Sequence, residues 1–140
     1  EVMPHACIGV DVITGFPGET HELFLNTMRF IQDLPVSYLH VFTYSERANT
    51  TALRISEVVP MSERQERTAQ LRMLSEKKKH AFYKEYAGES RKVLWESANE
   101  NGRMLGYTDN YIRVSKALNE GQFNTVQMES LQTGDVRFDD

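Results

Sequence analysis

The sequence contains one cysteine, Cys7, among its 140 residues. A single thiol excludes an internal disulfide, and it excludes a metal or iron–sulfur site built only from cysteines of one chain. The four histidines offer no substitute, because no two of them have the H-x₃₋₅-H spacing that is common in zinc sites. We therefore expect no metal site made by this chain alone.

Long apolar runs are also missing. No run approaches the ~20 residues that a helix needs to cross a bilayer, and no signal-peptide pattern is present. We therefore expect a cytoplasmic protein without membrane contact. The chain opens at Glu1 with no initiator methionine, and we interpret this start as a point inside a longer protein.

The formal charge of -4 is unevenly distributed along the chain. Acidic residues dominate 1–61 and 89–140, whereas basic residues outnumber acidic ones in 62–88. Only this middle segment, which contains Lys77 and Lys78, has a charge suited to phosphate. A solvated helix face explains the same lysines equally well.

The first part of the chain has the pattern of a βαβ unit. Residues 6–14 are apolar at nearly every position, which is typical of a strand buried on both faces of a parallel sheet. Apolar residues at helical spacing predict a helix over about 20–33, with Thr20 as its N-cap. A second strand is expected at 38–43, and strand, helix and strand at this spacing form a βαβ unit.

The two faces of the first strand differ in character. Val10 and Val12 alternate onto one face, which we expect to contact the helix. Asp11 and Ile13 alternate onto the other face, which we expect to line a barrel lumen or a ligand. A structural partner for Asp11 is favoured over a catalytic role, because a lone buried charge is costly. His40, on the same side of the second strand, is interpreted as a satisfied core histidine.

A polar loop over 45–61 leads into the longest predicted helix, at about 63–87. The run from Ser62 to Gln65 matches a capping box, and Gly88 is a natural helix stop. Short β-rich runs separated by turns then follow. They lie at 91–97, 103–108, 111–116, 122–131 and 135–138. Five such strands predict a small antiparallel barrel of the OB-like kind, so we expect three parts, at 1–61, 62–88 and 89–140.

Two segments at predicted strand ends are candidate ligand contacts. Gly15 and Gly18 lack a Cβ atom, so the turn that they bound allows close approach of a ligand to the backbone, although a tight structural connection explains it too. The turn is not a P-loop, because no Gly-Lys-Ser/Thr follows it. Arg47, just past the second strand, could bind phosphate or carboxylate, but alone it is an ordinary surface arginine.

Aromatic residues in the β-rich part could stack nucleobases or fill the core of the small barrel. These residues are Trp95, Tyr107, Tyr111 and Phe123. Tyr111 is the best stacking candidate, because Arg113 lies next to it on the alternating face.

Three runs together resemble one family. They are Gly9–Glu19, Phe42–Arg47 and Gly106–Val114. The chain resembles the radical S-adenosylmethionine methylthiotransferases that modify tRNA, and the third run is most similar to the subgroup that acts on threonylcarbamoyl-adenosine. The family usually has proline where Thr43 stands, and Arg-x-Gly-Thr where this chain has Arg47-Ala48-Asn49-Thr50.

The resemblance implies an α/β fold made of the last part of a TIM-like radical-SAM barrel, a linker helix and a TRAM domain. It implies an S-adenosylmethionine site and two 4Fe–4S clusters in the parent protein. The cofactor residues would be Ile13, Gly15, Phe16, Gly18, Phe42 and Tyr44. The tRNA-binding residues would be Arg47, Lys77, Lys78, Tyr107, Tyr111 and Arg113.

The cluster-binding motif Cys-x-x-x-Cys-x-x-Cys is absent, so no cofactor is fully bound by this fragment. We expect no catalytic residue here and no activity of the chain alone. Two alternatives stay open: a non-catalytic RNA-binding module, and a methylthiotransferase that acts on a ribosomal-protein side chain. Two strands cannot close a barrel, so we also expect self-association through open barrel edges.

Overall fold

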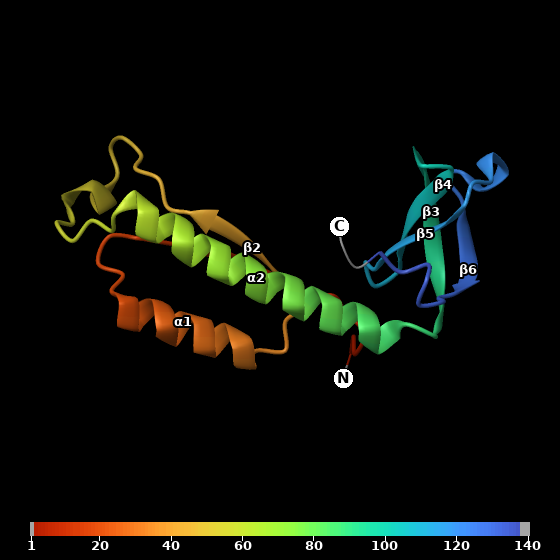
Figure 1. Ribbon diagram of the computed structural model, residues 1–140, viewed down its shortest axis with the longest axis horizontal. Coiled ribbons are helices and arrows are strands. Elements are labelled where there is room, and N and C mark those ends of the chain that lie inside the picture. Colours follow the sequence, from red (N-terminus) through yellow and green to blue (C-terminus); the bar gives the residue numbers. More distant parts are fainter. Residues whose placement is uncertain (1, 138–140) are drawn as a thin grey trace. The chain divides into compact units, whose positions relative to one another are not determined.

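The computed structural model describes residues 2–137 (Figure 1). It divides them into two compact units, and the boundary falls inside the longest helix. One unit is Ile8–Lys78, and the other combines the residues up to Cys7 with those from Lys79 onward. No helix in the described range is both long and apolar enough to span a membrane.

The unit Ile8–Lys78 contains a parallel two-stranded sheet and two α-helices. Its elements are β1 (Gly9–Thr14), α1 (His21–Asp33), β2 (Tyr38–Thr43), the short 3₁₀ helix η1 (Thr51–Arg54) and most of α2 (Met61–Tyr86). β1 and β2 are parallel, with Gly9 opposite Tyr38 and Thr14 opposite Thr43. The predicted order of strand, helix and strand is therefore confirmed.

Both ends of α1 are fixed by side chains. At its start, the Thr20 hydroxyl accepts a hydrogen bond from the Leu23 backbone N–H at 3.2 Å, as predicted for an N-cap. At its end, Lys78 Nζ donates to the carbonyl oxygens of Gln32 and Leu34, at 3.1 and 2.8 Å. A lysine is favourable there because the carbonyls at a helix C-terminus lack intrahelical partners. Lys78 thus has a structural role in this unit.

The apolar core of this unit lies on one face of the sheet. Its buried residues are Phe24 and Ile31 of α1, Leu39 and Val41 of β2, and Leu71 of α2. Val10 and Val12 of β1 pack against them, so both helices cover the same face, and Figure 1 shows α1 running alongside α2.

The opposite face of the sheet is open. Ile13 and Phe42 are 59% and 53% exposed, and Asp11 and His40 are exposed as well. The interpretation of Asp11 as a buried charge and of His40 as a core histidine was therefore wrong for this structure. The physical reason is that the described residues cover only one side of the two strands.

Helix α2 begins earlier than the sequence pattern indicated. It starts at Met61, and the Arg64 N–H already donates to the Pro60 carbonyl at 3.0 Å, so Ser62 is not its N-cap. The capping-box prediction was wrong. The predicted stop is confirmed, since Gly88 has φ +98° and its N–H leaves the helix to donate to the Leu131 carbonyl.

The carboxy-terminal unit contains a four-stranded antiparallel sheet in the order β5-β4-β3-β6. Its elements are β3 (Ser90–Glu100), β4 (Arg103–Thr108), β5 (Arg113–Ala117), the 3₁₀ helix η2 (Glu120–Gln122) and β6 (Val126–Ser130). The fifth predicted strand forms only one bridge within the described residues, between Val136 and Val114. Position 138 of that predicted strand lies outside the described residues.

Buried side chains from the sheet, from the segments beside its strands and from the end of α2 form the core of this unit. They are Tyr83, Tyr86, Val93, Trp95, Met104, Ile112, Val114, Leu131 and Val136. Phe123 packs against this core, whereas Tyr111 is 56% exposed. Trp95 and Phe123 are therefore core residues, and Tyr111 is available at the surface.

The open face and unpaired edges of β1 and β2 generate the first prediction. We expect the isolated chain to self-associate through this sheet, because exposed strand edges beside apolar side chains template pairing. Sedimentation velocity over a dilution series should show a concentration-dependent dimer, and Phe42→Ser should shift it toward the monomer. The matched control is Val126→Ser, which removes an apolar side chain that is 62% exposed on the other unit. A monodisperse monomer at every concentration would contradict this expectation.

Candidate functional site

A cavity of about 540 Å³ lies at the carboxyl ends of β1 and β2. Five of the residues singled out in the sequence line it: Ile13, Phe16, Phe42, Tyr44 and Arg47. The carboxyl ends of parallel strands are where α/β folds usually bind ligands. The structure therefore brings the predicted cofactor side chains together in one cavity. Arg47, for which the resemblance implied a contact with tRNA, also lines this cavity.

The wall of this cavity combines apolar and aromatic side chains with the polar residues Thr43, Ser45, Arg47 and Thr50. The Phe16 and Tyr44 rings meet edge to face, with centroids 5.4 Å apart, and Ile13 and Phe42 are more than half exposed. The Tyr44 hydroxyl oxygen is buried and has no hydrogen-bond partner in residues 2–137. An apolar cleft with a few convergent polar groups is the usual character of a small-molecule site.

Arg64 of α2 fixes the segment that closes the cavity after β2. Its side chain is 3% exposed, and its Nε donates to the Val59 carbonyl at 2.7 Å. The two terminal nitrogens donate to the Tyr44 carbonyl at 3.2 Å and to Glu46 Oε1 at 2.6 Å. The hydrogen bond from Arg64 lowers the pKa of the Glu46 carboxyl, because it stabilises the charged form.

Arg67, one turn further along α2, fixes the turn after β1. One of its terminal nitrogens donates to both the carbonyl and the Oε1 of Glu19, each at 2.7 Å. The same Glu19 Oε1 accepts from the Gly15 N–H at 2.9 Å, which closes the turn upon itself. The second terminal nitrogen pairs with Glu63 at 3.1 Å.

Gly15 and Gly18 shape this turn but do not line the 540 Å³ cavity. Both have positive φ angles, +77° and +88°, which L-residues with a side chain rarely adopt. A Cβ on Gly15 would lie 2.3 Å from Cγ of Arg64, whereas one on Gly18 would meet nothing within 4 Å. Gly15 therefore allows the buried arginine to pass directly beneath the strand end.

Arg64, Arg67 and Thr68 were not among the site residues predicted from the sequence. The Thr68 hydroxyl lies 2.7 Å from the hydroxyls of both Thr14 and Thr43, which are the last residues of β1 and β2. The available signal was the position of these three polar residues on one face of a helix, at i, i+3 and i+4. That pattern does not distinguish a buried polar face from a solvated one.

Three of the six predicted tRNA-binding residues, Tyr107, Tyr111 and Arg113, lie together in the carboxy-terminal unit. The Tyr107 and Tyr111 rings are nearly parallel, with centroids 4.7 Å apart and an interplanar angle of 12°. The Arg113 guanidinium lies 4.5 Å from the Tyr107 centroid, and Arg113 also pairs with Glu96 at 2.9 Å. Lys77 and Lys78 belong to the other unit.

The described residues offer no set of ligands for an iron–sulfur cluster or a metal ion. Residues 2–137 contain no group of three or more His, Cys, Asp or Glu side chains that could hold a metal ion. The residues present therefore do not fit a 4Fe–4S cluster, which needs several thiolates at one point.

Substitutions at the two glycines of the turn can be compared for their effect on the free energy of unfolding. Gly15→Ala and Gly18→Ala both place a side chain at positive φ, which costs roughly 1–2 kcal/mol. Gly15→Ala should cost more, because its methyl group must also displace Arg64. The free energy of unfolding in urea checks this difference, and equal losses for the two variants would contradict it.

The Glu46–Arg64 pair should make the stability of the fold depend on pH. Because the folded-state pKa of Glu46 lies below 4.5, the pair stabilises the fold above pH 4.5, and the contribution disappears as the pH falls through the lower folded-state value. The melting temperature of the wild type should therefore fall more steeply in acid than that of Glu46→Gln. Parallel melting curves from pH ~7 to ~3 would show that the pair contributes nothing.

Comparisons with known proteins show which proteins this chain is similar to. No family model matches the chain. A threonylcarbamoyladenosine tRNA methylthiotransferase of Rickettsia prowazekii is 35% identical over 95% of this chain and 31% of its own length. The Bacillus subtilis protein of the same name is 37% identical over 81% of this chain and 26% of its own length.

A second enzyme name occurs among the relatives. A tRNA-2-methylthio-N(6)-dimethylallyladenosine synthase of Oceanobacillus iheyensis is 37% identical over 76% of this chain and 21% of its own length. The chain thus spans about a third or less of the curated relatives that it matches. It belongs to the tRNA methylthiotransferase family, in which it corresponds to a carboxy-terminal portion of the longer members.

Proposed function

We propose that this chain is the carboxy-terminal part of a tRNA methylthiotransferase that modifies threonylcarbamoyl-adenosine. The observation that carries the proposal is the 35–37% identity to enzymes of that name over most of this chain. The cavity at the ends of β1 and β2 supports it, because four of the six residues expected around S-adenosylmethionine line it: Ile13, Phe16, Phe42 and Tyr44. We also propose a cytoplasmic location, because tRNA, the proposed substrate, is used in translation there.

The chain's two units support an assignment of each part of the chain to a domain of the parent protein. The parallel pair β1–β2 has helices on one face and apolar side chains exposed on the other, as the wall of a TIM-like barrel would. We assign residues 1–61 to the last part of a radical-SAM barrel, 62–88 to a linker helix and 89–140 to a TRAM domain. The antiparallel sheet of the last part is consistent with an OB-like RNA-binding barrel.

The 540 Å³ cavity fits S-adenosylmethionine in size and chemistry. Its volume falls within the ~300–1,000 Å³ of typical ligand sites. Ile13, Phe16 and Phe42 would contact the adenine, and the unpartnered Tyr44 hydroxyl would hydrogen-bond to a polar atom of the ligand. Arg64 holds this wall in place from behind. When bound, S-adenosylmethionine supplies the methyl group for the modification.

The iron–sulfur clusters belong elsewhere in the parent protein. One cysteine cannot hold either of the two 4Fe–4S clusters, so this chain contributes no cluster ligand set of its own. We infer that the chain alone is inactive and that its part is to bind S-adenosylmethionine from one side and to bind tRNA.

The tRNA contacts are proposed on the exposed ring of Tyr111, with Tyr107 and Arg113 stacked beneath it. Bases of single-stranded RNA stack readily on such platforms. Exposed Lys77 and Arg47 would contact phosphate. Lys78 is the weaker candidate, since two of its N–H groups donate to the end of α1.

Titration of the chain with S-adenosylmethionine tests the cofactor site. We expect the methyl resonances of Ile13 and the ring resonances of Phe42 and Tyr44 to shift in NMR spectra, with weak affinity because only one wall of the site is present. Phe42→Ser should weaken the binding, whereas Val126→Ser should not. Unchanged site resonances at millimolar ligand, or shifts unaffected by Phe42→Ser, would count against the proposal.

A further inference from the structure

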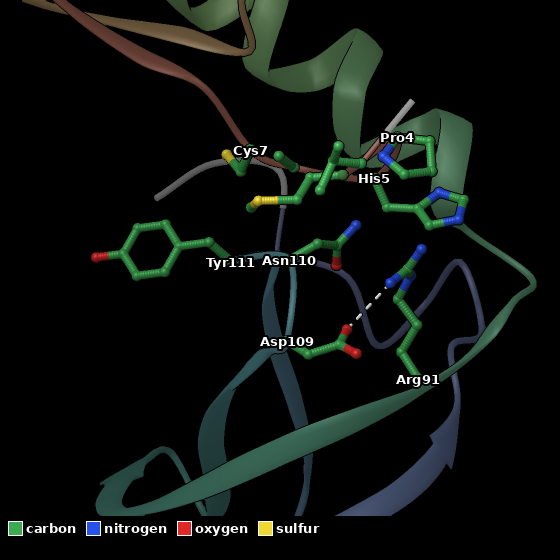
Figure 2. A pocket seen from close by; sticks show the side chains of 10 residues that line it. Pro4, His5, Cys7, Arg91, Asp109, Asn110 and Tyr111 are labelled. Atoms are coloured by element: carbon green, nitrogen blue, oxygen red, sulfur yellow. Dashed lines mark hydrogen bonds and ion pairs between the residues drawn. The ribbon is translucent and has the colours of Figure 1, made fainter.

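A second cavity, of about 450 Å³, lies wholly within the carboxy-terminal unit. The segment from Val2 to Cys7 forms one side, and Arg91, Asp109, Asn110 and Tyr111 form the other (Figure 2). It shares no residue with the proposed S-adenosylmethionine site. The chemistry of its own side chains therefore decides what it can bind.

The side chain of Asn110 provides an unused hydrogen-bond donor at this cavity. Asn110 is 6% exposed, and its Nδ2 has no acceptor among the described residues. Figure 2 shows the amide directed into the space between His5 and Arg91, whereas the Tyr111 ring is directed to the opposite side. A buried N–H without a partner is costly, so a ligand in this space is expected to supply an acceptor.

The orientation of this amide follows from its neighbour. Its other amide atom, Oδ1, accepts from the Thr108 hydroxyl at 2.7 Å. The Thr108 hydroxyl itself accepts from the Ile112 N–H at 2.8 Å, so its own proton needs an acceptor. Oδ1 of Asn110 provides one, and the reversed amide would leave that proton without a partner. The Nδ2 group is therefore the atom that the cavity presents.

The charge beside the cavity favours an uncharged acceptor over an anion. The Arg91 side chain is 10% exposed, and its terminal nitrogens pair with Asp109 at 3.0 Å and with Glu89 at 3.2 Å. Two carboxylates thus surround one guanidinium, and the remaining negative charge repels a phosphate or a carboxylate. Both carboxylates are about half exposed, at 50% and 48%, so they can also attract a basic group of the ligand.

Apolar side chains form the rim of the cavity on its other side. Val2 and Met3 are 98% and 72% exposed, and Pro4 and Ala6 continue this lining. Exposed apolar side chains beside a polar group are characteristic of surfaces that bind proteins. A peptide segment carries a carbonyl acceptor at every residue and apolar side chains beside it, so it matches both features.

We propose that this cavity docks a peptide segment of a partner protein. A main-chain carbonyl of the segment accepts from Asn110 Nδ2, and an apolar side chain packs on Met3. A basic residue of the segment, and not an acidic one, faces Asp109 and Glu89. The inference goes beyond the proposed function, because it requires neither S-adenosylmethionine nor tRNA.

Two blocked dipeptides, acetyl-Leu-Lys-amide and acetyl-Leu-Glu-amide, test the chemistry of the ligand. Each is titrated into the isotope-labelled full chain, and NMR spectra follow the Asn110 side-chain amide and the Met3 backbone N–H. We expect the Leu-Lys peptide to shift both resonances at millimolar concentration. The Leu-Glu peptide should bind roughly threefold more weakly, because its carboxylate meets Asp109 and Glu89.

A variant of Asn110 tests the donor. Asn110→Asp keeps the acceptor for Thr108 but replaces Nδ2 by an oxygen that repels a carbonyl, so the Leu-Lys peptide should bind roughly tenfold more weakly. The Met3 backbone resonance reports this binding. Asn119→Asp is the matched control, since it adds the same charge outside the cavity and keeps the acceptor for the Gly121 N–H. It should bind the peptide as the wild type does.

A variant of Met3 tests the apolar rim. Met3→Ser should weaken binding of the Leu-Lys peptide roughly fivefold, because an apolar contact is lost. Met73→Ser is its matched control, since Met73 is 74% exposed and belongs to the other unit. If Asn110→Asp does not fold, the comparison of Met3→Ser with Met73→Ser decides the outcome.

The inference is overturned if the Leu-Lys peptide leaves both resonances unchanged, which would mean that only water occupies the cavity. It is also overturned if the peptide binds to Asn110→Asp as tightly as to the wild type. Inorganic phosphate and a single-stranded oligouridylate serve as competing probes. A shift of the Asn110 amide with either of them, and not with the peptide, would contradict the proposed ligand class.

Discussion

The buried guanidinium of Arg64 is the interaction on which the candidate cofactor site depends. A charge that is 3% exposed would be costly without partners, yet Arg64 donates to Val59, Tyr44 and Glu46. These bonds fix the backbone that follows β2, and Arg67 does the same for the turn that follows β1. Two adjacent turns of one helix thus position both loops that adjoin the open face of the sheet.

In the carboxy-terminal unit, buried hydrogen bonds between neutral groups likewise fix the backbone beside an exposed side chain. Thr108 is 5% exposed, and its hydroxyl and backbone bond to Asn110, Tyr111 and Ile112. This network holds an aromatic ring at the surface in a conformation that the ring alone would not favour. In both units, then, exposed apolar side chains are presented by a buried polar network, which is how rigid binding surfaces are built.

The sequence predicted the regular elements well and the supporting networks poorly. Thr20, Gly88 and the alternation of Val10 and Val12 act locally, so their roles could be inferred from neighbours in the chain. The resemblance also selected Ile13, Phe16, Phe42 and Tyr44, which converge on one cavity. Arg64 could not be found in this way, because its burial depends on Glu46 and Gly15, far away in sequence, and because its neighbours at 62–68 are all polar. Asn110 was missed for a related reason: an asparagine in a turn is ordinary, and only the structure reveals its unpartnered amide.

The most direct test of this account is amide hydrogen exchange at Tyr44, whose N–H donates to the Thr14 carbonyl at 2.8 Å. Arg64→Met retains an apolar stem but removes the two side-chain hydrogen bonds from residue 64 to Tyr44 and Glu46. The account predicts faster exchange at Tyr44 in this variant, with no change at Trp95, whose N–H donates to the Thr125 carbonyl in the other unit. Equal exchange rates at Tyr44 in the variant and the wild type would contradict the claim that Arg64 holds the site together.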